Sequence, residues 1–158
     1  MAASVARSLA KAETIARARG VALTPIRRRV LELILKARRP VGAYDLLADL
    51  KTAAGKAMPP TVYRTLDFLI AQGFVHRIES KNAFIACIDA DSPHRSQFAI
   101  CDNCGRTVES MDDDLARKLS RQAAKLGFKI ERQIVEMHGT CAACLDGTGS
   151  RPRQRHPA

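Results

Sequence analysis

The chain has 158 residues, of which 46% are apolar and 4% aromatic, and carries a formal net charge of +10. This length fits one ordinary domain or two small ones, and the charge predicts a polyanionic partner, either nucleic acid or an anionic membrane surface. No apolar run approaches the roughly 20 residues that span a bilayer, and no secretory h-region is visible at the N-terminus, so we expect a cytoplasmic protein.

Apolar residues recur at helical spacing in three segments before residue 51. The first segment ends at Gly20, the second starts after Thr24, an N-cap candidate, with Pro25 at its first position, and the third follows Pro40 and Gly42. Three amphipathic helices need one another to bury their apolar faces. The predicted stripes are Val5, Leu9, Ala12 and Ala16; Ile26, Val30, Leu33, Ile34 and Ala37; and Ala43, Leu46, Leu47 and Leu50.

A fourth helix is predicted between Pro59 and Gly73. Its first turns offer side chains that can reach base edges and phosphates in a major groove. On this helix alone, an ordinary surface helix is an equally good interpretation. The predicted inward positions are Val62, Leu66, Leu69 and Ile70, and the candidate DNA contacts are Thr61, Tyr63 and Arg64, with Tyr44 from the third helix.

Two strands, 74–78 and 83–88, are predicted next, joined by the polar turn 79–82. Helices followed by a β-hairpin form a winged helix, a DNA-binding architecture that suits the positive charge.

Two C-x-x-C turns, Cys101-x-x-Cys104 and Cys141-x-x-Cys144, are the strongest signal in the chain. One turn presents two thiolates to a tetrahedral ion, and two turns complete the Cys₄ shell of a structural zinc site. Redox dithiols share the pattern, but the odd total of five cysteines in a chain without an export signal favours metal or thiol chemistry over disulfides.

A second metal site is predicted from His76, Cys87, His94 and Glu109. Taken singly, each residue has an ordinary interpretation, such as a surface histidine or a small buried thiol. The predicted topology unites them, because two lie on the paired strands, one in the linker and one on a strand of the second half. One sulfur, two imidazoles and one carboxylate suit tetrahedral Zn²⁺ better than Fe²⁺ or Mn²⁺.

The second half is predicted to form a small β-α-β unit. A helix starts at Asp112–Asp114 and ends near Gly127, and a strand is expected over 128–137. Such a unit has too little core to stand alone, so pairing with a second copy is expected. His138 is either a spare metal ligand or a plain strand-end histidine, and the second interpretation is favoured. The tail after Leu145 is expected to be disordered. The helix stripe is Leu115, Leu119, Ala123 and Leu126.

The chain resembles the ferric uptake regulator family, specifically its zinc-responsive members. The motifs that carry this resemblance are L-T-P-I-R-R-R-V-L, A-Y-D-L-L, P-P-T-V-Y-R-T-L-D-F-L, Q-G-F-V-H-R-I-E-S, C-D-N-C-G and H-G-T-C-A-A-C. The resemblance implies a homodimeric repressor with an N-terminal winged helix and a C-terminal dimerisation domain, which binds operator DNA when zinc-loaded and represses zinc-uptake genes. It matches Tyr63 and Arg64 to DNA contacts, and the two predicted metal sets to a sensing and a structural zinc. The family's iron sensors usually carry a His-rich run, which this chain lacks.

These observations together predict an α+β fold with two zinc ions per chain. The expected divisions are a winged-helix DNA-binding domain over 1–89, a hinge over 90–96, a dimerisation domain over 97–146 and a basic tail over 147–158. Two alternative functions fit these residues less well. An iron- or peroxide-sensing regulator of the same family is disfavoured by Cys87 in the sensing set. A zinc or thiol enzyme is disfavoured because four ligands leave no open position for water.

Overall fold

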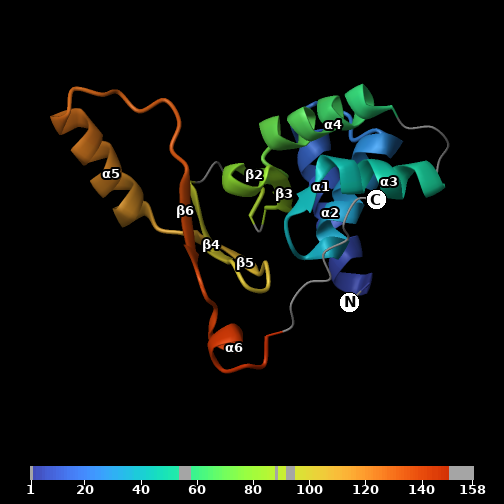
Figure 1. Cartoon of the computed structure of the whole chain (residues 1–158). Coiled ribbons are helices and arrows are strands. Elements are labelled where there is room, and N and C mark those ends of the chain that lie inside the picture. Colours follow the sequence, from blue (N-terminus) through green and yellow to red (C-terminus); the bar gives the residue numbers. More distant parts are fainter. Residues whose placement is uncertain (1, 54–57, 88, 92–94, 150–158) are drawn as a thin grey trace. The chain divides into compact units, whose positions relative to one another are not determined.

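The computed structural model of the chain describes residues 2–53, 58–87, 89–91 and 95–149 (Figure 1). The chain divides into two compact units, Met1–Pro93 and His94–Ala158, which we call the N-terminal and C-terminal units. Each unit combines helices with a three-stranded sheet, so the predicted α+β class is confirmed. None of the described helices is long and apolar enough to cross a lipid bilayer.

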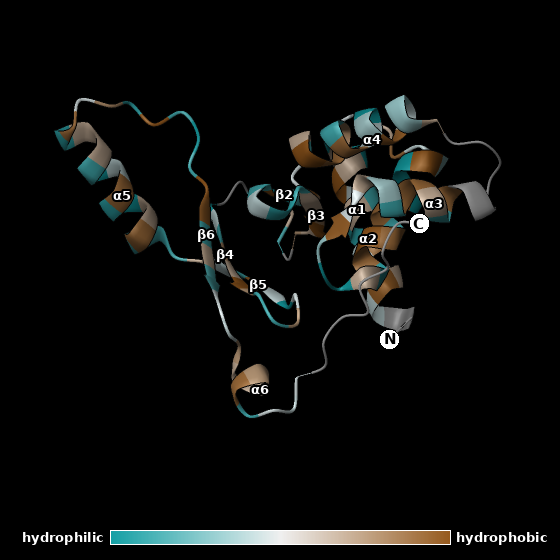
Figure 2. Cartoon of the chain, in the orientation of Figure 1, coloured by the Kyte–Doolittle hydropathy of each residue, from teal (hydrophilic) through white to brown (hydrophobic). Residues whose placement is uncertain are grey.

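Four helices build the core of the N-terminal unit. They are α1 (Ala2–Ala18), α2 (Pro25–Ala37), α3 (Ala43–Ala53) and α4 (Pro59–Ala71). Their apolar stripes meet in one cluster, as the helical periodicity predicts, and the hydrophobic positions of these helices alternate with hydrophilic ones along the ribbons in Figure 2. The fully buried members include Val30, Ile34, Leu46, Leu50, Val62, Leu66 and Leu69.

The start of α2 differs in detail from the prediction. Thr24 occupies the N-cap position, but its side chain makes no capping hydrogen bond. Its backbone carbonyl instead accepts the first helical hydrogen bond, from the Arg28 N–H at 2.9 Å. Pro25, at the first helical position, has no backbone N–H, so one fewer donor at this helix start needs a hydrogen-bond partner. The helix can therefore begin here without a side-chain cap.

The buried face of α4 is rotated slightly from the predicted one. Thr65 is buried at 4% exposure, whereas Ile70, predicted to face inward, is 36% exposed. At about 100° per residue, Thr65 and Ile70 lie on opposite sides of the line through Val62, Leu66 and Leu69, each roughly 70° from its centre. The prediction that Ile70 faces inward is therefore wrong, because the buried face of α4 extends to the side of Thr65 and not to the side of Ile70.

A small sheet completes the winged helix. Its strands are β2 (Val75–Ile78) and β3 (Ala83–Ala86), as predicted, with the short β1 (Val41–Gly42) on the outer side of β3, giving the order β1-β3-β2. The turn between β2 and β3 is a 3₁₀ turn, η1 (Glu79–Lys81), closed by Asn82 at φ 44°. Asn tolerates this left-handed conformation better than most residues. The two-residue β1 carries no periodic pattern and was not predicted.

The C-terminal unit is an open sheet with one long helix. Strand β4 (Ser96–Cys101) lies in the centre, antiparallel to β5 (Thr107–Met111) and parallel to β6 (Val135–Gly139). The helix α5 (Asp113–Lys125) connects β5 to β6, and the short α6 (Ala142–Leu145) follows. Asp112 caps α5, because its carboxylate accepts hydrogen bonds from the Asp114 and Leu115 N–H groups at 2.9 and 3.0 Å. The predicted helix start is confirmed.

The strand predicted over 128–137 is wrong over its first seven residues, because β6 begins at Val135. Regular pairing begins at Val135 opposite Gln97 and follows β4 to Cys101. A strand needs a neighbour for its backbone groups. In this parallel register the stretch before Val135 runs beyond Ser96, the first residue of β4, and none of the described strands pairs with it.

Large apolar side chains of the C-terminal unit remain exposed. Ala116 is the only buried residue of α5. The predicted inward stripe, in contrast, is Leu115, Leu119, Ala123 and Leu126. Leu126 is 67% and Phe128 71% exposed. Others exposed in this unit are Val108, Met111, Leu119, Ile134, Met137 and Leu145.

Candidate metal centres and nucleic-acid interface

The structure brings the sulfur atoms of Cys101, Cys104, Cys141 and Cys144 together at one end of the C-terminal sheet, all within 4.8 Å of one another. The Cys101–Cys144 and Cys104–Cys141 sulfur pairs are 3.8 and 3.7 Å apart. Four sulfurs at the usual Zn–S distance of about 2.3 Å around a tetrahedral ion are about 3.8 Å from one another. The donor set and its spacing therefore fit a Cys₄ zinc site.

Two tight turns hold these cysteines. In the first, the Gly105 N–H donates to the Cys101 carbonyl at 2.9 Å, and Gly105 adopts φ +73°, a conformation that favours glycine. In the second, the Cys144 N–H donates to the Cys141 carbonyl at 2.9 Å as α6 begins. β4 ends at Cys101 and β6 ends two residues before Cys141, so the parallel β4–β6 pair carries the two turns to the same end of the sheet.

Backbone N–H groups make one sulfur of the cluster acidic. The N–H groups of Cys141 and Cys104 lower the pKa of Cys101 to about 6, and the former donates to its sulfur at 3.3 Å. Burial raises the pKa of Cys144 to about 12, helped by hydrogen bonds to the neighbouring thiols. A cation would reverse this second effect, because metal ligation requires the thiolate form.

His138 lies on β6 outside the sulfur cluster. Its Nδ1 is 2.9 Å from the Asp102 carboxylate, next to Cys101, and its Nε2 is 3.9 Å from Glu136. A carboxylate partner of this kind holds the imidazole against the first cysteine turn.

Two of the predicted sensing residues meet in the N-terminal unit. His76 lies on β2 opposite Ile85 of β3, and Cys87 follows the end of β3. Their ligand atoms lie within 4.8 Å of each other, and both side chains are partly exposed. The Cys87 N–H donates to the Phe74 carbonyl at 3.0 Å, which extends the β2–β3 pairing and fixes the thiol beside the imidazole.

The other two predicted sensing residues belong to the C-terminal unit. Glu109 lies on β5 opposite Phe98, and its carboxylate accepts a hydrogen bond from the Ser96 hydroxyl at 2.5 Å. His94 lies outside the described residues.

The predicted DNA contacts occupy exposed positions. Thr61, Tyr63 and Arg64 lie on the first turns of α4, and Tyr44 lies at the start of α3 with 76% of its surface exposed. Val62, Leu66 and Leu69 anchor the inward side of α4 in the core. The helix therefore presents its own three candidate contacts on a rigid element.

Three residues near the candidate sites carried no signal in the sequence. Arg19 and Lys11 make contacts around the stretch that follows Cys87, but in the sequence they are two of 26 cationic side chains. Gly149 packs against Cys144, although it belongs to the segment predicted as a tail. Residues 150–158 of that segment lie outside the described residues.

Comparison with known proteins places the chain in a family. A model of the ferric uptake regulator family matches residues 18–138. The zinc uptake regulation protein of Escherichia coli K12 is 45% identical over 139 residues, covering 87% of this chain and 81% of that protein. A solved zinc uptake regulator complexed with zinc and DNA has a TM-score of 0.87 at 44% identity, covering 90% of this chain and 96% of that one. For the crystal structure of holo XcZur, the TM-score is 0.82 at 46% identity, with 87% and 96% covered. This chain belongs to the ferric uptake regulator family of transcription regulators.

Proposed function

We propose that this chain is a zinc-responsive transcriptional repressor, which binds operator DNA as a homodimer when zinc-loaded and represses zinc-uptake genes. The similarity to a zinc uptake regulator complexed with zinc and DNA carries the proposal, because it extends over 90% of this chain at 44% identity. The protein acts in the cytoplasm by binding and has no catalytic role, in keeping with a family of regulators.

The structural zinc of this proposal belongs to Cys101, Cys104, Cys141 and Cys144. The sulfur spacing of 3.7 and 3.8 Å supports the assignment. Closing the end of the small sheet with four thiolates compensates for a core in which few side chains are buried.

The sensing zinc belongs to His76, Cys87, His94 and Glu109, so each chain takes two zinc ions. The proximity of the His76 and Cys87 ligand atoms supports this set, as does the partly exposed Glu109 carboxylate. A thiolate in the set favours zinc over the iron of an iron- or peroxide-sensing relative. A zinc ion at this site would form coordinate bonds to all four ligands and would thereby link the two units. Since the ligands come from both units, they can meet only in restricted orientations of the winged helix.

The winged helix over 1–89 reads DNA, and the region 97–146 forms the dimer, with 90–96 between them as a hinge. Thr61, Tyr63, Arg64 and Tyr44 contact DNA. The exposure of the first three on the first turns of α4, and of Tyr44 at the start of α3, supports this role. The exposed apolar side chains around α5 provide the surface that a second copy covers. In a two-fold dimer, the two recognition helices must match major grooves about 34 Å or a multiple apart.

The experiment that tests this function selects duplexes from a random DNA library with the zinc-loaded protein, followed by sequencing. The proposal expects an enriched sequence with two-fold symmetry, bound by protein with zinc and released by a chelator of the sensing zinc. An enrichment that is the same with and without zinc contradicts the proposed response, and no enrichment contradicts DNA reading.

A further inference from the structure

Arg19, just after the end of α1, donates hydrogen bonds to two backbone carbonyls from distant parts of the N-terminal unit. Its Nη1 donates to the Gln72 carbonyl at 2.5 Å, and its Nη2 donates to the Ala90 carbonyl at 2.9 Å. Gln72 is the C-cap residue of α4, and Ala90 lies on the stretch that follows Cys87. One guanidinium thus links the end of the DNA-reading helix to the backbone beyond a candidate zinc ligand.

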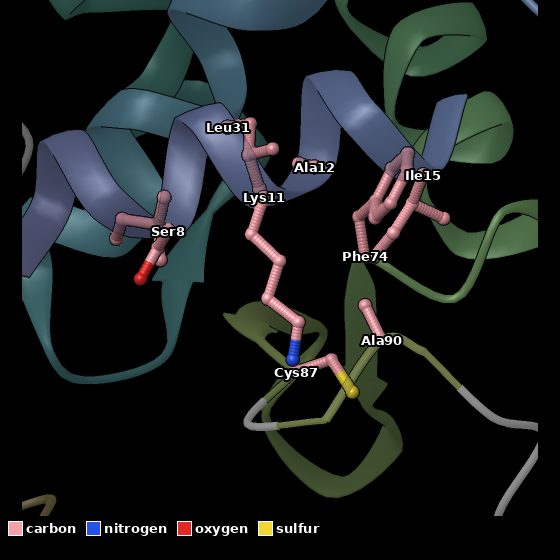
Figure 3. A pocket seen from close by; sticks show the side chains of 9 residues that line it. Ser8, Lys11, Ala12, Ile15, Leu31, Phe74, Cys87 and Ala90 are labelled. Atoms are coloured by element: carbon pink, nitrogen blue, oxygen red, sulfur yellow. The ribbon is translucent and has the colours of Figure 1, made fainter. Parts of the chain in front are cut away.

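Lys11 adds a second contact from α1 to the same stretch. We call its described residues Cys87, Asp89, Ala90 and Asp91 the exit segment. The Lys11 ammonium lies 2.5 Å from the Asp91 carboxylate and 3.8 Å from that of Asp89. The hydrogen bond to Asp91 raises the pKa of Lys11 above its usual value. Figure 3 shows the Lys11 side chain extending from α1 toward Cys87.

Apolar packing under the exit segment is incomplete. A pocket of about 60 Å³ lies between α1, α2 and the exit segment, and Cys87, Ala90 and Phe74 help to line it (Figure 3). Side chains that line an open pocket contact fewer neighbouring atoms and so make fewer dispersion contacts than side chains in a closed core. The exit segment therefore depends strongly on polar contacts: those from Arg19 and Lys11, and the Cys87 N–H bond to Phe74. The Arg19 guanidinium also lies 5.9 Å from the centre of the Phe74 ring. This cation–π contact restrains the position of the guanidinium.

We propose that Arg19, assisted by Lys11, is a positioning residue for the zinc response, because it holds the exit segment and Cys87 in a fixed relation to the C-terminal end of α4. This role rests on the proposed function. Without the contact, Cys87 can reach its zinc by a local shift of the exit segment, and zinc binding then constrains the DNA-reading helix less. Lysine cannot replace arginine fully, since a single ammonium lacks the planar fork that reaches two separate carbonyls.

The test measures the coupling between zinc and DNA in the full chain. Affinity for the duplex selected by the zinc-loaded protein is measured with saturating zinc and with chelator, and the ratio of the two affinities is compared among variants. Arg19→Ala is expected to lower this ratio roughly threefold to thirtyfold, Arg19→Lys to lower it less, and Arg17→Ala to leave it unchanged. Arg17 is the matched control, an exposed cation in the last turn of α1. By linkage, the effect of the duplex on zinc affinity must fall by the same factor.

A purely structural role of Arg19 gives a different result. The melting temperature then falls and DNA binding weakens equally with and without zinc, so the ratio stays at the parent value, and the positioning role is overturned. If Arg19→Ala does not fold, as judged by circular dichroism, Lys11→Ala decides, with a lowered ratio expected and an unchanged ratio overturning the proposal. A parent protein whose DNA binding ignores zinc overturns the proposed function itself.

Discussion

Gly149 lies so close to Cys144 that the second cysteine turn has no room for a side chain there. A Cβ at this position would lie 2.5 Å from the Cys144 sulfur and 3.1 Å from the Cys144 backbone nitrogen. The Gly149 N–H also donates to the Ala143 carbonyl at 2.6 Å, which keeps the backbone in place.

Gly149→Ala should therefore displace Cys144 and weaken the structural zinc site. Disturbing a residue that supports metal ligands typically costs about tenfold to a hundredfold in metal affinity, and a loss of this size is expected in competition with a chelator. Gly139→Ala is the control, because a Cβ at Gly139 meets nothing within 4 Å. Equal zinc affinity in both variants would show that the close approach to Cys144 has no consequence.

The acidity of the cysteines predicts how zinc binding responds to pH. The lowered pKa of Cys101, about 6, means that its thiolate is present above pH 6 and lost as the pH falls through that value. The raised pKa of Cys144, about 12, means that its thiol keeps its proton at neutral pH until metal displaces it. Zinc affinity should therefore rise with pH between 6.5 and 8.5, by about tenfold per pH unit for each displaced proton. Chelator competition at several pH values measures this slope, and a flat profile is incompatible with displacement of the Cys144 proton.

Arg64 tests the DNA-reading surface. Arg64→Ala should weaken binding to the selected duplex by about 1–3 kcal/mol if the guanidinium reads a base, and by less, with a smaller salt dependence, if it contacts phosphate. Zinc content and dimer mass should be unchanged, because Arg64 is exposed. Lys118→Ala on α5 removes the same charge from the C-terminal unit and serves as control. Unaltered binding by the Arg64 variant would move the reading surface elsewhere.

Among the helices and strands, the helices are predicted well from the sequence. A predicted strand is confirmed only where a neighbouring strand pairs with it. The stripes of α1 to α4 were recognisable because one buried face dominates each helix, and the error at Ile70 concerns the edge of such a face. The stretch before Val135 alternates like a strand, but pairing depends on where β4 begins, which no local pattern encodes. The proximity of the four cysteine sulfurs was predictable from spacing and residue type. The contacts of Arg19, Lys11 and Gly149 depend on the tertiary fold and were not.

The exposed apolar surface of α5 and the residues after it is proposed to form the dimer. Phe128→Asp should shift the protein from dimer to monomer, because a carboxylate would have to be buried against the second copy without a partner. Analytical ultracentrifugation measures the mass as a function of concentration. Lys129→Asp, at the exposed neighbouring position, is the control and should remain dimeric. A dimeric Phe128→Asp protein would place the interface on another surface.

In the whole molecule, the two proposed zinc ions differ in which unit supplies their ligands. The four cysteines belong to one unit, so their zinc can stabilise that unit without reporting on the winged helix. His76 and Cys87 belong to the N-terminal unit and Glu109 to the C-terminal unit, so a shared ion depends on the orientation of both. A shift from mostly open to mostly closed requires about 5.5 kcal/mol of differential affinity, which a four-ligand zinc site can supply.

The central claim is that the sensing set converts zinc binding into DNA binding. The most direct measurement titrates binding to the selected duplex against buffered free zinc for the parent, Cys87→Ser and His76→Ala proteins. We expect both variants to remain folded dimers with one zinc per chain at the four cysteines, and we expect neither to gain DNA affinity as free zinc rises over the range in which the parent does. Variants that respond to zinc with the midpoint and amplitude of the parent would contradict the account and place the sensor elsewhere in the chain.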